Sequence, residues 1–208
     1  MKRFFTIIPL QVRGNLKTYL YEAVGNQKLQ MQTKTAFPII AAMEGYLEAG
    51  ESFDVVTVVS DSQTCRDNLQ KFQEELAAVC ERTGAVCREM QQVWLDDDER
   101  VAAQISTFQK LIDFVQDEDD LYCCMTYGTK PQSTAMMMAV QYAYRVMKNA
   151  SIECVVYGQV RRDGTDQEAW DAKIYDMTAL VQMDEIVRVL ADRGVKNPKE
   201  LIDKIISL

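Results

Sequence analysis

The sequence predicts an α/β fold: a Rossmann-like, mostly parallel sheet with helices on both faces. Short apolar runs rich in β-branched and aromatic residues alternate with longer amphipathic segments along the whole chain. The composition is that of an ordinary globular protein, with 48% hydrophobic and 26% charged residues, and no internal repeat or Pro/Gly-rich linker divides the 208 residues. Strands and helices that alternate in this way favour a parallel sheet whose two faces are both covered.

Strands are expected where β-rich runs end at turn residues. The clearest candidates are residues 4–8, which stop at Pro9, and residues 53–59, which stop at Ser60 and Asp61. Weaker strand candidates are residues 85–88, 121–125, 152–157 and 173–177. The spacing of apolar residues predicts helices at residues 35–49, 64–82, 99–116, 132–148, 180–191 and 201–206, the last after a cap at residues 197–200.

The length favours a single domain. We expect residues 1–178 to form this domain and residues 179–208 to form a C-terminal helical extension packed on it. The longest apolar runs are far shorter than the roughly 20 residues that cross a bilayer. The apolar run that follows the first three residues is also too short for the apolar core and cleavage site of a signal peptide. A cytoplasmic protein without membrane contact is therefore expected.

The chain contains no histidine, which excludes Ser-His and Cys-His nucleophile pairs and histidine metal ligands. Its six cysteines form no C-x-x-C pair, so we interpret them as free thiols in a reducing compartment. Neither a metal nor an organic cofactor is expected. The formal net charge of -8 argues against a general nucleic-acid-binding face, and no DNA partner is expected.

A ligand site is expected where the strand order of such a sheet reverses. In a Rossmann-like order this point lies beyond the carboxyl ends of the first and fourth strands. The two loops that follow these strands are residues 9–15 and 126–132. No Walker A or Gly-x-Gly-x-x-Gly sequence is present, which argues against a P-loop NTPase and an ordinary dinucleotide dehydrogenase.

The second loop carries the signals of a tight turn that leads into a helix. Gly128 can adopt a backbone conformation closed to other residues, Thr129 and Gln132 have capping-box spacing, and Pro131 falls in the first helical turn. Free N–H groups at the positive end of a helix dipole, with Lys130 beside them, suit a phosphate. The alternative is an ordinary capped helix with a solvated lysine.

Two acidic runs, at residues 96–99 and 117–120, resemble metal-binding clusters. Both lie at the boundary of an expected element. We therefore expect the first run to cap a helix and the second to be a solvated loop.

The segment from Asp120 to Pro131, an apolar helix after it, and the run that ends at Tyr157 and Gly158 resemble one known family. This is the CRISPR-associated Rossmann fold (CARF) family, the sensor domains of type III CRISPR systems. The resemblance extends weakly along the whole chain, through residues 9–11, 35–38 and 174–178. The order of these motifs is more specific than any one of them.

The resemblance implies a CARF-like homodimer with a shared pocket for a cyclic oligoadenylate, most often the tetra- or hexa-adenylate, that controls an effector in antiviral defence. The ligand-binding residues that it implies are Pro9, Leu10, Gln11, Thr126, Tyr127, Gly128, Thr129, Lys130 and Gly158. Weaker candidates are Arg13, Lys34 and Arg161. Tyr127 is expected either to stack on an adenine or to pack at the dimer interface.

Four alternatives remain open at this point. No effector is visible after Asp176, so the chain is a stand-alone sensor, the sensor part of a longer protein, or a ring nuclease of the same fold. A metal-independent ring nuclease would place a ribose 2′-hydroxyl in line with its phosphate beside Lys130. Binding is favoured over catalysis because no general base, and so no catalytic residue, can be assigned. The fourth alternative is an unrelated α/β protein that binds one mononucleotide or phosphorylated metabolite per subunit.

Overall fold

The computed structural model describes residues 1–96, 98, 100–162 and 171–207, which form two compact units, residues 1–176 and 177–208. The first unit is an α/β sandwich, as the sequence predicts. Its sheet has the strand order β2-β7-β6-β5-β1-β3-β4, and every neighbouring pair is parallel except β6 and β7. The strands are β1 (Lys2–Ile7), β2 (Glu22–Val24), β3 (Ser52–Ser60), β4 (Val86–Leu95), β5 (Asp120–Cys124), β6 (Ser151–Arg161) and β7 (Asp171–Asp176).

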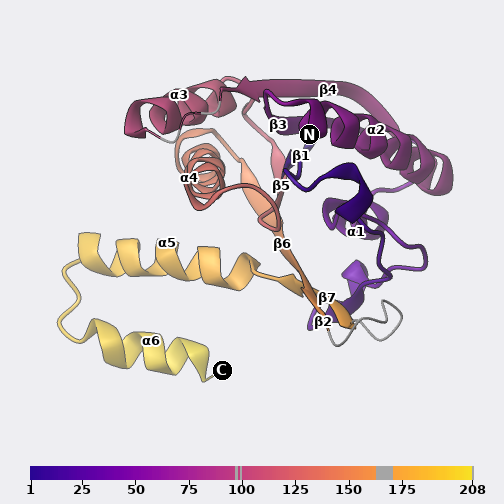
Figure 1. Cartoon of the computed structure of the whole chain (residues 1–208). Coiled ribbons are helices and arrows are strands. Elements are labelled where there is room, and N and C mark those ends of the chain that lie inside the picture. The colour runs from indigo at the N-terminus through magenta and orange to yellow at the C-terminus, as the bar shows by residue number, and fades with distance from the viewer. Residues whose placement is uncertain (97, 99, 163–170, 208) are drawn as a thin grey trace. The chain divides into compact units, whose positions relative to one another are not determined.

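Helices cover both faces of this sheet. Figure 1 shows α1 (Ile39–Tyr46) and α2 (Gln63–Thr83) on one face, and α3 (Val101–Ile112) and α4 (Lys130–Val146) on the other. Two short 3-10 turns, η1 (Arg13–Asn15) and η2 (Gln27–Leu29), lie between β1 and α1 in the chain. The second unit consists of α5 (Thr178–Asp192) and α6 (Pro198–Ile206), which contact each other.

The elements that differ from the sequence prediction do so for local reasons. Helix α1 begins at Ile39 because the residue before a proline avoids helical backbone angles, and Thr35 instead forms a β-bridge with Tyr19. Strand β4 runs to Leu95, seven residues beyond the predicted end, because the polar residues Arg88, Glu89, Gln91 and Gln92 interrupt its apolar residues and hide it from a search for apolar runs. Strand β2 has three residues, too few to show a period.

The centre of the sheet is buried on both faces, as expected for parallel strands between helices. Phe4 and Phe5 of β1 and Val55 and Val56 of β3 are fully buried. The ring of Phe4 stacks on that of Tyr122 in β5, with 4.4 Å between their centroids. The six cysteines are free thiols, as the sequence predicts.

At the amino ends of the strands, a buried ion network joins β1, β3 and β5. Arg3 Nε donates to Asp119 Oδ2 at 2.8 Å and Arg3 Nη1 lies 3.5 Å from Asp54 Oδ2, while Arg88 from β4 donates to Asp54 at 2.9 Å. Asp119 and Arg3 are both almost completely buried. The expectation that residues 117–120 form a solvated loop is therefore wrong for Asp119, because the carboxylate folds inward to neutralise Arg3.

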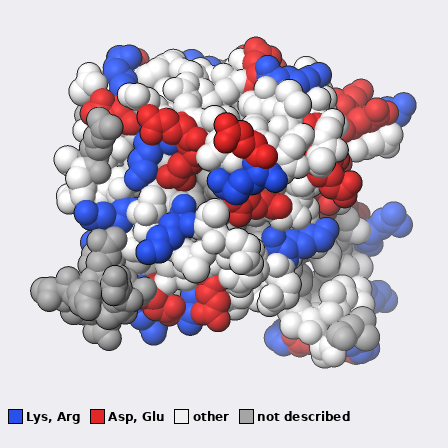
Figure 2. Space-filling view, turned by 90° about the vertical axis from the view of Figure 1, so that its right-hand side faces the viewer, with Lys and Arg blue, Asp and Glu red and all other residues white. Residues whose placement is uncertain are grey.

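The surface carries charges of both signs. On the face shown in Figure 2, which lies on the side of α1 and α2, Lys and Arg side chains alternate with Asp and Glu side chains and form no extended basic patch. No helix within the described residues is long and apolar enough to span a bilayer.

Candidate functional site

The strand order reverses between β1 and β5, where the sequence predicts a ligand site. These two strands are neighbours and parallel, so their carboxyl ends open side by side at one edge of the sheet. The chain leaves β1 at Ile8 and Pro9, and it leaves β5 at Met125 and Thr126. The two predicted loops are thus brought together by the fold.

The turn after β5, residues 126–129, has the geometry that its sequence predicts. Gly128 has a φ of +95°, and a Cβ added to it would lie 2.7 Å from Ile7 Cδ1 and 2.9 Å from Ile7 Cγ2. Only glycine fits here, because the conformation is left-handed and β1 lies directly behind the turn. We call these four residues the Gly128 turn.

Helix α4 begins with the predicted capping box. The N–H of Thr129 donates to Gln132 Oε1 at 3.0 Å, and the N–H of Gln132 donates to Thr129 Oγ1 at 3.4 Å. Pro131 has no N–H, so three of the residues at this helix start offer no amide to a ligand. The donors that remain are fewer than the sequence suggests: the N–H groups of Gly128 and Lys130, together with the exposed ammonium of Lys130.

Thr126, Tyr127 and Gly158 hold the Gly128 turn in place. The N–H of Gly158 donates to Thr126 Oγ1 at 2.8 Å, and Tyr127 Oη donates to the carbonyl oxygen of Ala36 at 2.7 Å. Burial raises the pKa of Tyr127 well above its usual range. Its ring packs mostly against the core of its own subunit, which leaves little of it for an adenine or for a second copy.

Gly158 lies inside β6 and not in a loop after it. It is buried, and an added Cβ would lie 2.5 Å from Pro38 Cγ and 3.2 Å from Tyr21 Cε1. The glycine is needed for this close packing, so its connection to the site is through the hydrogen bond to Thr126.

The loop after β1 is fixed by the neighbouring helix α2. Asn68 Nδ2 donates to the carbonyl oxygens of both Pro9 and Gln11 at 2.8 Å, and Asn68 is fully buried. Within this loop Pro9 is buried, while Leu10 and Gln11 are exposed at the same edge of the sheet as the Gly128 turn. The structure therefore presents Leu10 and Gln11, and not Pro9, to a ligand.

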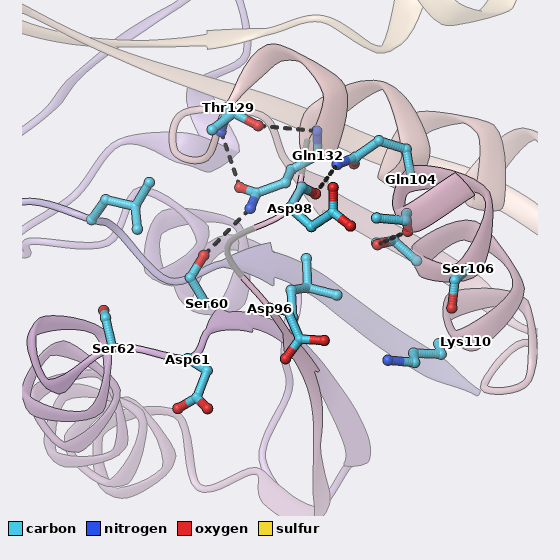
Figure 3. A pocket seen from close by; sticks show the side chains of 14 residues that line it. Ser60, Asp61, Ser62, Asp96, Asp98, Gln104, Ser106, Lys110, Thr129 and Gln132 are labelled. Carbon is cyan, nitrogen blue, oxygen red and sulfur yellow. Dashed lines mark hydrogen bonds between the residues drawn. The ribbon is translucent and has the colours of Figure 1, made fainter. Parts of the chain in front are cut away.

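A polar cavity of about 270 Å³ opens at the same edge, beside the exits of β3 and β4. In Figure 3 the side chains of Asp96 and Lys110 extend toward its open space, and Gln132 bridges Thr129 and Ser60. Its lining comes from the ends of β1, β3 and β4, the starts of α2 and α4, and one side of α3 along most of its length: Leu10, Ser60, Asp61, Ser62, Leu95, Asp96, Asp98, Ala103, Gln104, Ser106, Thr107, Lys110, Thr129 and Gln132. We call it the polar cavity.

Several charged groups at the polar cavity already have partners. Asp61 pairs with Arg66, and Lys110 Nζ donates to the carbonyl oxygen of Trp94 at 3.3 Å. Hydrogen bonds from Arg100 hold the pKa of the Asp98 carboxyl at about 2.

The acidic run at residues 96–99 arranges the start of α3 only in part as predicted. Asp98 accepts the N–H of Arg100 at 2.9 Å, but Arg100, the cap residue itself, makes no side-chain cap bond. Residues 97 and 99 lie outside the described part of the chain.

An apolar groove of about 460 Å³ runs between α3 and α4, separated from the polar cavity by Gln104. Val101 and Ile105 on α3 and Met138 on α4 line it and are at least half exposed. Lys130 lies along this groove and does not line the polar cavity. Gln104 Oε1 is buried without a hydrogen-bond partner among the described residues.

The weaker candidate ligand-binding residues do not line the polar cavity or the apolar groove. Lys34 is exposed just before the β-bridge of Thr35, and Arg161 is the exposed last residue of β6. Arg13 lies in η1, and its side chain is outside the described part of the structure.

Sequence reasoning missed most of the polar cavity. Ser60 and Asp61 follow the second predicted strand, and that strand also ends at the ligand edge, so its exit was a usable signal. Gln104, Ser106 and Lys110 had no such signal. They reach the cavity only because α3 packs against α4.

No protein-family model matches this chain, and no curated protein matches it. Within the described residues, no group of three or more Cys, Asp or Glu side chains is arranged to hold a metal ion.

Proposed function

We propose that this chain is a sensor similar to the CARF domains of CRISPR-associated antiviral defence, and that it binds a cyclic oligoadenylate at the carboxyl ends of β1 and β5. The observation that carries the proposal is the Gly128 turn. A glycine at φ +95° stands at the point where the strand order reverses and leads directly into the capped start of α4. The glycine lets the chain turn against β1 directly into a helix start, and the amides of a helix start are a common binding site for phosphate.

A phosphodiester above this turn would meet three kinds of group. These are the N–H groups of Gly128 and Lys130, the exposed ammonium of Lys130, and the loop of Leu10 and Gln11 on the β1 side. Charge-assisted hydrogen bonds of this kind are the strong ones in phosphate recognition. A ring with several phosphates needs more than one such turn, and two copies related by a two-fold axis supply them.

A shared site requires that the two copies meet near the Gly128 turn. The apolar stretch of α4 supports this less than its sequence suggests, because Ala135, Met136, Ala139, Val140 and Ala143 are buried within their own subunit. The exposed side chains of Met138, Val101 and Ile105 beside Lys130 are the apolar surface that favours contact between two copies.

We expect a dimer by light scattering at micromolar concentration. A strict monomer, with and without cyclic tetra-adenylate, would reject the shared site.

Calorimetry with cyclic tetra- and hexa-adenylate tests the ligand. We expect one ring bound per two chains. Lys130→Ala should weaken binding about ten- to a hundred-fold, because it removes a charge-assisted hydrogen bond of about 1.5 to 3 kcal/mol. Lys148→Ala is the matched control, since Lys148 is an exposed lysine beyond the other end of α4. Unchanged affinity of Lys130→Ala rejects the site, and one mononucleotide per chain favours the metabolite-binding alternative.

Binding is expected to dominate over cleavage. The chain has no histidine, and positioned proton transfer, which typically contributes about a hundred- to ten-thousand-fold, has no assignable group here. Cyclic tetra-adenylate incubated with excess protein should remain mostly intact over minutes. Rapid appearance of linear products ending in a 2′,3′-cyclic phosphate, lost in Lys130→Ala, would identify a ring nuclease instead.

A further inference from the structure

The polar cavity has a lining that selects its occupant by charge and by hydrogen-bond type. Its described charged residues are three carboxylates, Asp61, Asp96 and Asp98, and one lysine, Lys110. Asp96 has no ion-pair partner among the described residues, and the lysine donates to the backbone of Trp94. Because Asp61 pairs with Arg66 and Asp98 with Arg100, the charges that remain at the cavity are those of Asp96 and Lys110, which are of opposite sign. The cavity therefore gives a phosphate no net attraction, and its acceptors favour a neutral group that carries hydrogen-bond donors.

The same cavity also has apolar walls. Leu10, Leu95 and Ala103 line it together with the hydroxyls of Ser60, Ser62 and Ser106. A moiety with apolar faces and donors at its edge matches this mixture, as a purine with its exocyclic amine and a ribose with its hydroxyls do. At about 270 Å³ the cavity lies just below the range of about 300 to 1,000 Å³ typical for whole drug-sized ligands. It therefore has room for one such moiety, not for a whole ring.

The polar cavity adjoins the proposed phosphate position. Thr129, the last residue of the Gly128 turn, and Leu10, from the loop after β1, line both regions, and Gln132 connects the turn to Ser60 across the cavity wall. A ligand with its phosphate at the turn can therefore place its next group in the cavity without crossing another element.

We infer that the polar cavity binds the neutral nucleoside part of an adenylate, with Asp96 and Ser106 facing its donors, while the phosphates stay outside at the Gly128 turn. This inference deepens the proposed function and rests on it for the phosphate position. In this arrangement the cavity distinguishes adenosine from ligands that have no hydrogen-bond donors. The Gly128 turn binds the negatively charged phosphates.

Adenosine, which has no phosphate, is the probe for the cavity. Ligand-observed saturation-transfer NMR with the full chain should show binding with a dissociation constant in the millimolar range. Ser106→Leu, which fills the cavity, should abolish the signal, and Asp96→Asn should weaken binding about tenfold by removing a charged acceptor. Gln109→Leu is the matched control, because Gln109 is an exposed residue of the same helix that does not line the cavity. Thermal unfolding of each variant verifies that it folds, and Asp96→Asn alters an exposed side chain, so it tests the cavity even if Ser106→Leu does not fold.

The outcomes separate this inference from the proposed function. Adenosine binding that survives in Lys130→Ala and is not displaced by inorganic phosphate supports a cavity distinct from the phosphate position. If cyclic oligoadenylates do not bind but adenosine does, the cavity stands and the ring proposal falls. If a ring binds while adenosine does not, or if both cavity variants bind adenosine as the native chain does, the inference is overturned and the ring proposal stands.

Discussion

The two ends of the parallel sheet carry similar charged residues, but these residues differ in how deeply they are buried and in how they are paired. At the amino ends, Arg3, Asp54 and Asp119 are almost completely buried and each charge has a partner of opposite sign. At the carboxyl ends, Asp61 and Asp98 pair with the exposed arginines Arg66 and Arg100, and Asp96 and Lys110 line an open cavity with no ion-pair partner among the described residues. The same residue types are structural at one end and available to a ligand at the other.

This difference follows from the geometry of crossover connections. The amino-end charges lie under the chain terminus and the loop before β5, where Gln116 N–H and the terminal amine also approach Asp119. At the carboxyl ends, each strand continues into a loop that leads to the start of a helix, and the loops leave a space between one another. Acidic runs of nearly the same sequence, residues 96–99 and 117–120, therefore acquire different roles.

The largest expected effect comes from opening the amino-end network. Asp119→Ala leaves Arg3 buried with only the longer contact to Asp54, so it should lower the free energy of unfolding by about 3 to 5 kcal/mol. Urea denaturation measures this. The contrasting variant is Arg100→Ala, which breaks an exposed ion pair with Asp98 and should leave the free energy of unfolding almost unchanged. Equal losses at the two ends would contradict the comparison.

A second effect should appear at the Gly128 turn. Gly128→Ala forces a side chain into a left-handed conformation and against Ile7, so it should destabilise the protein by about 1 to 3 kcal/mol and displace the start of α4. Gly14→Ala is the control, because an added Cβ there meets nothing within 4 Å. Chemical denaturation compares them, and a native-like stability of Gly128→Ala would show that the turn is not constrained.

The capping box should contribute less. Thr129→Ala removes the acceptor for the N–H of Gln132 and should cost about 1 kcal/mol. Thr134→Ala changes the same residue type on the same helix, at an exposed position whose hydroxyl bonds only to the carbonyl of Lys130, and should be nearly neutral. Thermal unfolding distinguishes the two. A neutral Thr129→Ala would indicate that water caps the helix equally well.

The smallest effect is a dependence on pH at Glu75, which supports the carboxyl end through Thr35 and Ala36. Burial raises the pKa of Glu75 above its usual value of 4.5, although the hydrogen bonds from Thr35 and Ala36 lower it in part. The folded state therefore binds this proton more tightly than the unfolded state, and its contribution to stability is lost as pH rises through the raised pKa.

Relative to Glu75→Gln, the native chain should gain stability as pH falls from neutral through this raised pKa toward 4.5. Urea midpoints measured across that range test the sign. The control is Glu74→Gln, which changes an exposed carboxylate one residue earlier on α2. A difference between Glu75→Gln and the native chain that does not change with pH would contradict the assigned burial.

Much of the carboxyl end could be predicted because it depends on local rules. The left-handed glycine, the Thr129–Gln132 capping box and the proline in the first turn of α4 all act within five consecutive residues. The adjacency of β1 and β5 followed from the alternation of strands and helices, since only a few strand orders suit such a chain.

What the sequence by itself determined is the fold class, the position of the strand-order reversal and the shape of the turn beside it, because each depends on residue order and near neighbours. Only the tertiary structure decided that Asp119 is buried on Arg3, that Tyr127 turns inward to Ala36, and that Ser106 and Lys110 line the polar cavity with Asp96. In each of these cases the decisive contacts join elements far apart in the chain. Their energies depend on burial and on which charges meet, and no local pattern of residues records either one.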